Sequence, residues 1–443
     1  MLEKLKIRNF KAFGEQGFEF RLKPLTILVG PNASGKSAVL EAVGLMAQTA
    51  ARSSGTQSGF DWRGRWVDFG VNGEAALHSG NLNAEMELGL TAWLDLFKLK
   101  QEEFSQEHVN LCRPISYIVD HIPRTRAWKH VVRIINNAEA ISTYRPGPNS
   151  ANTLEFRNAD IRGLFGPVSG GDAVFNAQLF VVGSQVDKTG TPFPEAQQKA
   201  TMFYHAMRYL REWMTTGIYL VGPNRLPRSE EQKYNKHDYA VGRSGEDTLN
   251  LLSYLFASPK YREVTAKINE WAQVFGLDSL TAGWARHKEL QGGFSDPNTS
   301  TPLGLQYSGY GSQQILPVIA QIFAAPKGSS ILIEEPEISL HPAAHIDLIR
   351  LFATGVRFGQ QILLTTHSST LPLALSEAAQ FGLTPDDVAI YHLQRQRDEV
   401  LVQELEVDSV WSIRGWIPSF SAVERKLLKK WVEKADLDSA QES

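Results

Sequence analysis

A glycine-rich octapeptide near the N-terminus carries the residue types that bind the phosphates of a nucleotide. Residues 30–37 read GPNASGKS, which fits the pattern G-x-x-x-x-G-K-[ST]. The two glycines let successive backbone N–H groups converge on phosphate oxygens, the lysine reaches the β- and γ-phosphates, and the last hydroxyl ligates Mg²⁺. We therefore expect ATP and Mg²⁺ as cofactors, with ATP bound by Gly30, Asn32, Ser34, Gly35, Lys36 and Ser37.

An apolar run that ends in acidic residues lies far along the chain, where residues 331–337 read ILIEEPE. A phosphoryl-transfer site needs a group that holds the cation and a base that positions the attacking water. We expect Glu334 beside the Mg²⁺ and Glu335 as the residue that polarises the water. The alternative is that these acids are an ordinary solvated end of a strand.

A second apolar run, QILLTTHS at residues 361–368, closes on a histidine. His367 is a candidate catalytic residue that hydrogen-bonds the γ-phosphate or the attacking water, although a lone histidine is often structural. Its position just beyond a buried strand favours function, because open α/β sheets bind ligands at the carboxyl ends of their strands.

A turn of small residues precedes another helical pattern, in the segment LQYSGYGSQQ at residues 305–314. The Ser308 side chain, the Gly309 backbone and the start of the following helix form an anion site in this interpretation. By itself the pattern Ser-Gly-x-Gly is weak, and a plain helix cap is the simpler explanation of it.

The elements that must position these residues follow from the spacing of apolar residues. Residues 25–29 read LTILV, which is typical of a strand buried on both faces, and residues 37–46 have the spacing of an amphipathic helix. This order of strand, glycine loop and helix argues against a chance match of the octapeptide in a surface loop. We also expect a helix near 342–358, a hairpin of 388–393 with 400–405, and a helix over 422–433.

Composition restricts the class of protein. The 443 residues contain 45 Lys and Arg against 48 Asp and Glu, so the formal charge is −3 and no overall basic field attracts nucleic acid. A single cysteine, Cys112, excludes an internal disulfide and a cysteine-based zinc site. The charged N-terminus and the lack of a long apolar run predict a cytoplasmic protein with no membrane segment.

Taken together and in this order, the four motifs resemble the ABC-type ATPase heads of the SMC, RecF and overcoming-lysogenization-defect (OLD) families. Residues 333–342, IEEPEISLHP, are especially similar to OLD proteins and to stand-alone ATPase subunits of bacterial antiphage systems such as Septu and PARIS. The opening LKIRNFK at residues 5–11 also resembles their first strand. The resemblance implies an α/β fold, namely a P-loop ABC-type ATPase head with a mixed sheet and an inserted helical subdomain.

The resemblance also implies a mechanism. In such heads two protomers enclose two ATP molecules head to tail, so Ser308 and Gly309 would clamp the γ-phosphate bound to Lys36 of the opposite subunit. Residues 339–341 match the loop that crosses the dimer interface beside Glu335. One departure is that Glu334 stands where the family usually has Asp. The glutamine loop is not identifiable, and Gln48 and Gln57 are weak candidates for it.

The implied organisation is an ATPase lobe at 1–95, a helical insert at 96–215, and a second ATPase lobe at 216–443. The simpler interpretation of the insert is core packing of a helical lobe. Arg225 and Arg228, after the strand-like segment at 218–221, are candidates to meet a nucleotide or partner phosphate. We see no room after His367 for the nuclease domain of full-length OLD proteins.

Two functions remain open at this point. One is an ATP-gated dimeric switch of an antiviral complex, which controls a separately encoded effector such as a nuclease or toxin. The other is a RecF-like or SMC-like ATPase that binds DNA during repair. Strong, salt-dependent affinity for DNA favours the second, and a stoichiometric protein partner favours the first.

Overall fold

The computed structural model describes residues 1–51, 60–93, 115–122, 124–134, 138–144, 152–157, 206–227, 239–284 and 290–415. These residues form a mixed α/β structure with three sheets. The expected α/β class is confirmed.

The central sheet has seven strands in the order β17-β16-β15-β3-β14-β13-β9. Five of them run parallel, and the hairpin partner β16 and the short β17 are antiparallel to their neighbours. Every residue of β3, β13, β14 and β9 is buried, which explains their continuous apolar sequences. The strands are β3 (Leu25–Val29), β9 (Ile218–Val221), β13 (Ser330–Glu334), β14 (Gln361–Thr366), β15 (Val388–Gln396), β16 (Glu399–Val407) and β17 (Ile413–Arg414).

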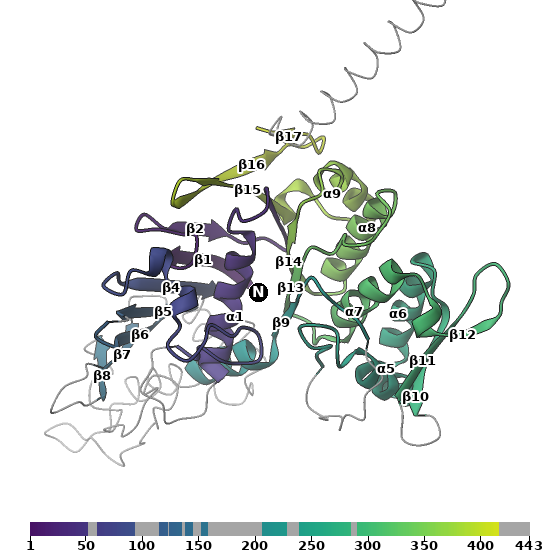
Figure 1. Ribbon diagram of the computed structural model, residues 1–443, viewed down its shortest axis with the longest axis horizontal. Coiled ribbons are helices and arrows are strands. Elements are labelled where there is room, and N and C mark those ends of the chain that lie inside the picture. Colours follow the sequence, from purple (N-terminus) through teal and green to yellow (C-terminus); the bar gives the residue numbers. More distant parts are fainter. Residues whose placement is uncertain are drawn as a thin grey trace, which may run out of the picture.

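Helices cover both faces of this sheet. Helix α1 (Lys36–Ala51) lies between the central sheet and a second sheet, while α7 (Tyr310–Ala324) and α8 (Ala344–Arg357) lie on the opposite face (Figure 1). Nearly all residues of α1 are buried because sheets enclose it on two sides. Strand β3 belongs to the segment 1–95, whereas its neighbours β14 and β15 belong to the segment 216–443. The two segments that were expected to form separate ATPase lobes therefore contribute strands to one sheet.

The second sheet is antiparallel throughout, in the order β2-β1-β4-β5-β6-β7-β8. Its strands are β1 (Leu2–Arg8), β2 (Phe18–Arg21), β4 (Met86–Ala92), β5 (Ile115–Ile122), β6 (Ala127–Ile134), β7 (Ala138–Tyr144) and β8 (Asn152–Arg157). The expected helical insert at 96–215 is therefore wrong for its described central part. Residues 115–122 alternate between buried and half-buried positions, which is the period of a strand. Within the described part of the insert, only 206–216 is helical.

A small α+β unit sits beside α7, at the right of Figure 1. It contains α5 (Thr248–Phe256), α6 (Arg262–Val274) and a sheet of β10 (Asp278–Trp284), β11 (Leu290–Ser295) and β12 (Pro302–Gly304). The remaining short helices are η1 (Glu74–Ala76), η2 (His78–Gly80), η6 (Pro259–Tyr261), η8 (Leu305–Tyr307), α9 (Thr370–Leu373), η9 (Ala374–Phe381) and η10 (Pro385–Asp387).

The predicted C-terminal hairpin is confirmed as β15 and β16, which pair antiparallel from Ile390 with Leu405 to Gln396 with Glu399. The predicted helix over 422–433 lies outside the described residues. Among the helices that the structure describes, we find none with the length and apolar character needed to cross a bilayer.

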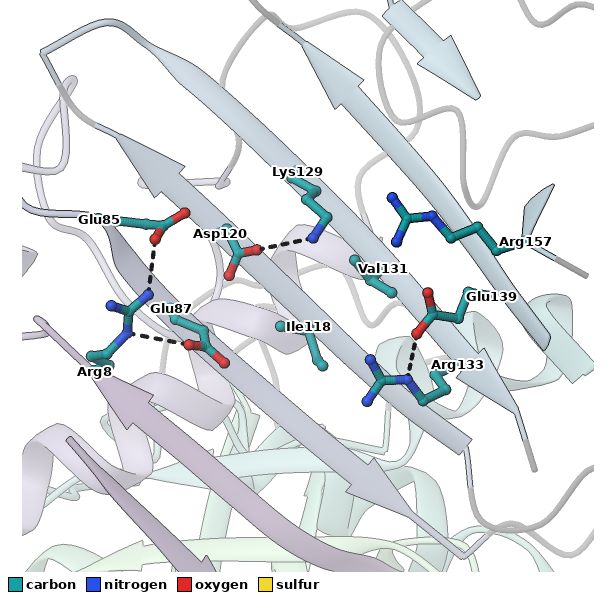
Figure 2. A pocket seen from close by; sticks show the side chains of 10 residues that line it. All are labelled: Arg8, Glu85, Glu87, Ile118, Asp120, Lys129, Val131, Arg133, Glu139 and Arg157. Carbon is teal, nitrogen blue, oxygen red and sulfur yellow. Dashed lines mark hydrogen bonds and ion pairs between the residues drawn. The ribbon is translucent and has the colours of Figure 1, made fainter. Parts of the chain in front are cut away.

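One face of the second sheet carries a lattice of ion pairs around a cavity of about 270 Å³ (Figure 2). Four cationic and four anionic side chains line it, so the lining carries no net charge and provides no basic field for nucleic acid. The ion pairs between these residues join Arg8 to Glu85 and Glu87, Lys129 to Asp120, and Arg133 to Glu139.

Asp120 on this face makes stability depend on pH. Burial raises the pKa of Asp120 from the usual 3.8 to about 6. The Lys129 ammonium group, whose Nζ lies 3.7 Å from Asp120 Oδ2, opposes this rise, and the Glu87 carboxylate adds to it. Between pH 4 and 6 the folded state binds more protons than the unfolded state, so the Asp120 contribution to the free energy of unfolding falls as the pH rises. We expect Asp120→Asn to remove this contribution, which denaturant titrations of both proteins across that range would reveal. A stability difference that does not change with pH would contradict the expectation.

Candidate nucleotide-binding site

The phosphate loop connects the carboxyl end of β3 to the amino end of α1. Gly30 leaves no room for a side chain, because a Cβ there would lie 2.2 Å from the Leu393 carbonyl oxygen on β15. Gly35 has φ 95°, in the left-handed region that favours glycine. The local backbone therefore requires glycine at both positions. Because neither residue has a side chain, the backbone of the loop can approach a ligand closely.

Lys36 occupies the first position of α1 and is only 4 % exposed. Its Nζ donates to the carbonyl oxygens of Gly30 and Pro31, at 2.9 Å each, so the side chain folds back over the loop. Burial lowers the pKa of Lys36 to about 8, and the nearby carboxylates of Glu335 and Glu337 offset part of that effect. A phosphate bound in the loop would place a negative charge beside this ammonium group and so compensate for the loss of its solvation.

The loop contains a second feature that suits a polyphosphate. The Ser34 side chain is buried, and among the described residues its Oγ has no hydrogen-bond partner. Buried hydroxyls are normally satisfied, so this one is poised for a group that the protein alone does not supply. The first turn of α1 contains no acidic residue, which leaves the positive end of the helix dipole available to an anion. Asn32 is exposed in the loop.

Strands β13 and β14 bring the predicted catalytic residues to this loop. Glu335 and His367 follow directly after them, and Nε2 of His367 lies 3.0 Å from Oε1 of Glu335. The other ring nitrogen, Nδ1, lies 3.5 Å from Nζ of Lys36. This order assigns a neutral tautomer, in which Nδ1 accepts from the ammonium group and Nε2–H donates to the carboxylate. Three residues from distant segments thus form one chain of polar contacts.

Glu337 is a member of the site that the sequence interpretation did not single out. Its Oε1 accepts hydrogen bonds from the His367 backbone N–H at 2.8 Å and from Thr366 Oγ1 at 2.6 Å. The carboxylate therefore fixes the end of β14 from which His367 projects. The acid-rich sequence of 334–337 was the available signal, but it does not say which acid faces which strand.

The predicted metal residues also lie together. Glu334 is 5 % exposed, and its carboxylate contacts the hydroxyl of Ser37. Its Oε1 also lies 3.1 Å from Nη2 of Arg243. Burial raises the pKa of Glu334; the Glu41 carboxylate adds to this, whereas Arg243 and Ser37 oppose it. A hydroxyl beside a carboxylate is an oxygen donor set that suits Mg²⁺.

Arg243 was missed at the sequence level. It lies between Gly242 and Gly245, which have φ of 80° and 74°, and it bridges Glu334 to Glu41, with Nη2 3.7 Å from Glu41 Oε1. Its Nη1 also donates to the Trp66 carbonyl at 2.9 Å. The two flanking glycines were the only local sign of a tight loop that directs an arginine inward.

Ser308 and Gly309 do not meet the phosphate loop within one chain. Gly309 is the N-cap of α7, and the Ser308 hydroxyl donates to the Leu305 carbonyl at 2.8 Å. Among the described contacts, no hydrogen bond joins either residue to 30–37. They lie near the Ser339 loop, since a Cβ at Gly311 would be 2.5 Å from the Ser339 carbonyl oxygen.

Two other candidates have structural roles. Arg225 is fully buried and its guanidinium donates to backbone carbonyls, so the idea that it meets a phosphate is wrong. Gln48 is buried too, and it bonds the backbone of Asp61, Trp66 and Val67. Arg228 and Gln57 lie outside the described residues.

Family models match two segments of the chain. Residues 4–90 match an AAA domain and residues 248–371 match an AAA ATPase domain. The first segment contains the phosphate loop, and the second contains Ser308, Glu334, Glu335 and His367. No curated protein matches the sequence.

Solved structures with a similar trace include three SMC heads, each 12 % identical to this chain. The SMC head domain from Thermotoga maritima has a TM-score of 0.39 and covers 92 % of this chain and 99 % of its own. An SmcHead bound to the C-winged helix domain of ScpA has 0.41, with 92 % and 98 % covered. An Smc head bound to the C-terminal domain of ScpA derived from Pyrococcus furiosus has 0.40, with 91 % and 96 % covered. Two distant parts of the sequence thus match models of AAA and AAA ATPase domains, and the first of them contains the glycine loop between β3 and α1.

Proposed function

We propose that the protein binds ATP with Mg²⁺ at the phosphate loop and hydrolyses it in a head-to-tail dimer. The observation that carries this proposal is the chain of contacts from Lys36 through His367 to Glu335. It places a phosphate-binding cation, a neutral imidazole and a carboxylate at the carboxyl ends of adjacent parallel strands, where α/β sheets bind ligands.

In this proposal the backbone N–H groups of residues 30–35, the Ser34 hydroxyl and Lys36 hold the phosphates. Ser37 and Glu334 hold Mg²⁺, which when bound neutralises charge on the β- and γ-phosphates. Glu334 already contacts Ser37, so the two ligands need little rearrangement. Arg243 keeps the buried Glu334 carboxylate oriented toward that position.

Glu335 is the proposed base for the attacking water. His367 donates to its carboxylate and accepts from Lys36, so it orients the base relative to the phosphate-binding cation. Glu337 anchors the His367 backbone and keeps the imidazole within reach of both. Hydrolysis then depends on side chains that are positioned before the nucleotide arrives.

Dimerisation completes the site in this proposal, because Ser308 and Gly309 stand apart from the phosphate loop of their own chain. They are flanked by two aromatic side chains with large exposed fractions, Tyr307 at 72 % and Tyr310 at 52 %. An α-helix N-terminus with an exposed apolar rim fits a second copy of the chain that presents a bound γ-phosphate.

Mixing two inactive variants tests the head-to-tail arrangement. Ser308→Arg places a bulky cation in the proposed γ-phosphate seat, and Lys36→Ala removes the cation of the phosphate loop. If Ser308 acts across the interface, a mixed dimer has one site with both lesions and one intact site. We expect the equimolar mixture to recover up to about a quarter of the wild-type ATPase rate, while each variant alone is inactive.

The matched control is Gln291→Arg, which adds the same side chain at an exposed position on β11 and should keep full activity. Native mass spectrometry of tagged variants would verify that mixed dimers form. Recovery that stays absent although mixed dimers are present would mean that Ser308 acts within its own chain.

We further propose that the ATPase is the switch subunit of an antiviral defence complex that controls a separate effector. The support is the similarity of residues 333–342 to such subunits. Copurification from a host that expresses the neighbouring genes tests it, and a stoichiometric partner is the expected result. Binding of duplex DNA whose affinity falls steeply with salt, without a protein partner, would favour the repair alternative.

A further inference from the structure

Arg225 is the largest side chain that the described structure buries completely. It follows β9 in the segment Gly222-Pro223-Asn224-Arg225, and its exposed fraction is 0 %. A guanidinium is rarely taken out of water unless its donors are used, and the free energy lost by leaving them unsatisfied is large. Burial lowers the pKa of Arg225 to about 10, which leaves the group charged at neutral pH.

The Arg225 guanidinium joins two parts of the proposed ATPase site. Its Nη1 donates to the Glu334 carbonyl at 2.7 Å, and its Nη2 donates to the Glu335 carbonyl at 3.2 Å. Its Nε donates to the Gln314 carbonyl on α7 at 3.0 Å, and the Arg225 backbone N–H donates to the Gln314 side chain at 2.9 Å. One residue thus connects the helix that begins beside Ser308 and Gly309 to the backbone of the proposed base.

The backbone that Arg225 holds is in an uncommon conformation. Glu335 has φ 46°, in the left-handed region that residues with a side chain rarely adopt. Such a conformation persists only where the surroundings impose it. On one side the Glu335 N–H donates to the Thr365 carbonyl at 3.0 Å, and on the other side Arg225 binds the Glu335 carbonyl. The Glu335 carbonyl also accepts from the Ile338 N–H at 3.2 Å. These backbone anchors set the direction in which the Glu335 side chain leaves the chain, and His367 then contacts its carboxylate.

Helix α7 connects the turn that contains Ser308 and Gly309 to Gln314. Gln314 lies five positions after Gly309, which is about 7.5 Å along a helix. Gln314 is buried, and its carbonyl and side chain both contact Arg225. An anion that seats at the start of α7 and shifts the helix must also shift the guanidinium or break its bonds.

We propose that Arg225 is a positioning residue that couples the seating of the partner's γ-phosphate on α7 to the alignment of Glu335. The inference rests on the proposed function and adds the means by which an assembled dimer would permit hydrolysis. Three acidic residues, Glu334, Glu335 and Glu337, surround the guanidinium electrostatically and favour its charged form. A lysine keeps the charge but has no planar fork, so it cannot bridge α7 to both carbonyls at once.

The first variant is Arg225→Lys. We expect the kcat for ATP to fall by about tenfold or more, while the affinity for ATP changes by no more than about twofold and ATP-driven dimers still form. A fall in ATP affinity that matches the fall in kcat would overturn the inference, since Arg225 would then be shaping the nucleotide site as a whole.

The same substitution in a Glu335→Gln background separates positioning from stability. If Arg225 acts through Glu335, Arg225→Lys should not lower the ATPase rate further once the Glu335 carboxylate has been removed. The melting temperature should still fall by the same amount in both backgrounds. Equal rate losses in both backgrounds would overturn the inference. Gln314→Leu removes only the side-chain acceptor of the Arg225 N–H, and it replaces Arg225→Lys as the test if that variant does not fold. It should also lower kcat, and this decrease should be absent in the Glu335→Gln background.

Wild-type protein without ATPase activity, even with dimers present, would refute the proposed function independently of Arg225. Wild-type activity together with additive variants would refute only the coupling. The two failures are therefore distinguishable in one set of measurements.

Discussion

Replacement of Lys36 by alanine is expected to abolish tight ATP binding while the fold survives. The Lys36 side chain is buried, yet the described contacts of its ammonium group are donations to two loop carbonyls and to one histidine ring nitrogen. Charge-assisted hydrogen bonds to phosphate are about twice as strong as neutral ones, so the nucleotide depends on this cation far more than the core does. We expect ATP affinity to fall by about a hundredfold or more in isothermal titration calorimetry.

The matched control is Lys267→Ala, which removes a lysine paired with Glu270 on the exposed side of α6. It should leave ATP affinity unchanged, and both variants should retain a cooperative thermal unfolding transition. Equal affinity of Lys36→Ala and wild type for ATP would show that the loop is not the nucleotide site.

The lowered pKa of Lys36, about 8, adds a pH signature to this prediction. Bound phosphate favours the ammonium form, so binding above pH 8 takes up a proton and ATP affinity falls as the pH rises. Calorimetry in buffers of different ionisation enthalpy would detect that uptake in wild type and its loss in Lys36→Ala.

Glu335→Gln is expected to keep ATP binding and to slow hydrolysis by about a hundredfold, in line with the usual contribution of a positioned base. The substitution preserves size, and the amide can still accept from His367, whose Nε2 lies 3.0 Å away. Only the ability to take a proton from water is lost. Because the nucleotide then stays uncleaved, ATP-bound dimers should accumulate and be visible by size-exclusion chromatography.

The matched control is Glu270→Gln on the exposed face of α6, which should turn over ATP at the wild-type rate. If Glu335→Gln hydrolyses ATP at an unchanged rate, Glu335 is not the base. Glu334→Gln and His367→Ala would then identify which neighbour performs that role.

The sequence alone determined the local parts of this site. The phosphate loop, the buried strand before it and the helix after it are specified by glycines, apolar runs and helical spacing within one short segment. The apolar strands at 330–334 and 361–366 could be located in the same way, and so could the hairpin of β15 and β16. Parallel strands in one sheet then imply that Glu335 and His367 lie near the loop, because their carboxyl ends share an edge.

The tertiary structure decided everything that depends on pairing between distant segments. The sequence interpretation took the mixed aromatic and polar pattern after residue 95 as helical, whereas 115–157 contains strands that continue the sheet begun by β1 and β4. The short alternation of buried and half-buried residues in these segments specifies strands only when neighbouring strands are available to pair with them.

The inward direction of the Arg225 side chain could not be predicted from the sequence for the same reason. An arginine is usually exposed, and only the meeting of β9, α7 and the end of β13 offers enough backbone carbonyls to hold a buried one. Local sequence therefore determined which residues can do the chemistry, and long-range packing decided which of them face one another, since a side chain's partners are set by the chain segments that fold around it.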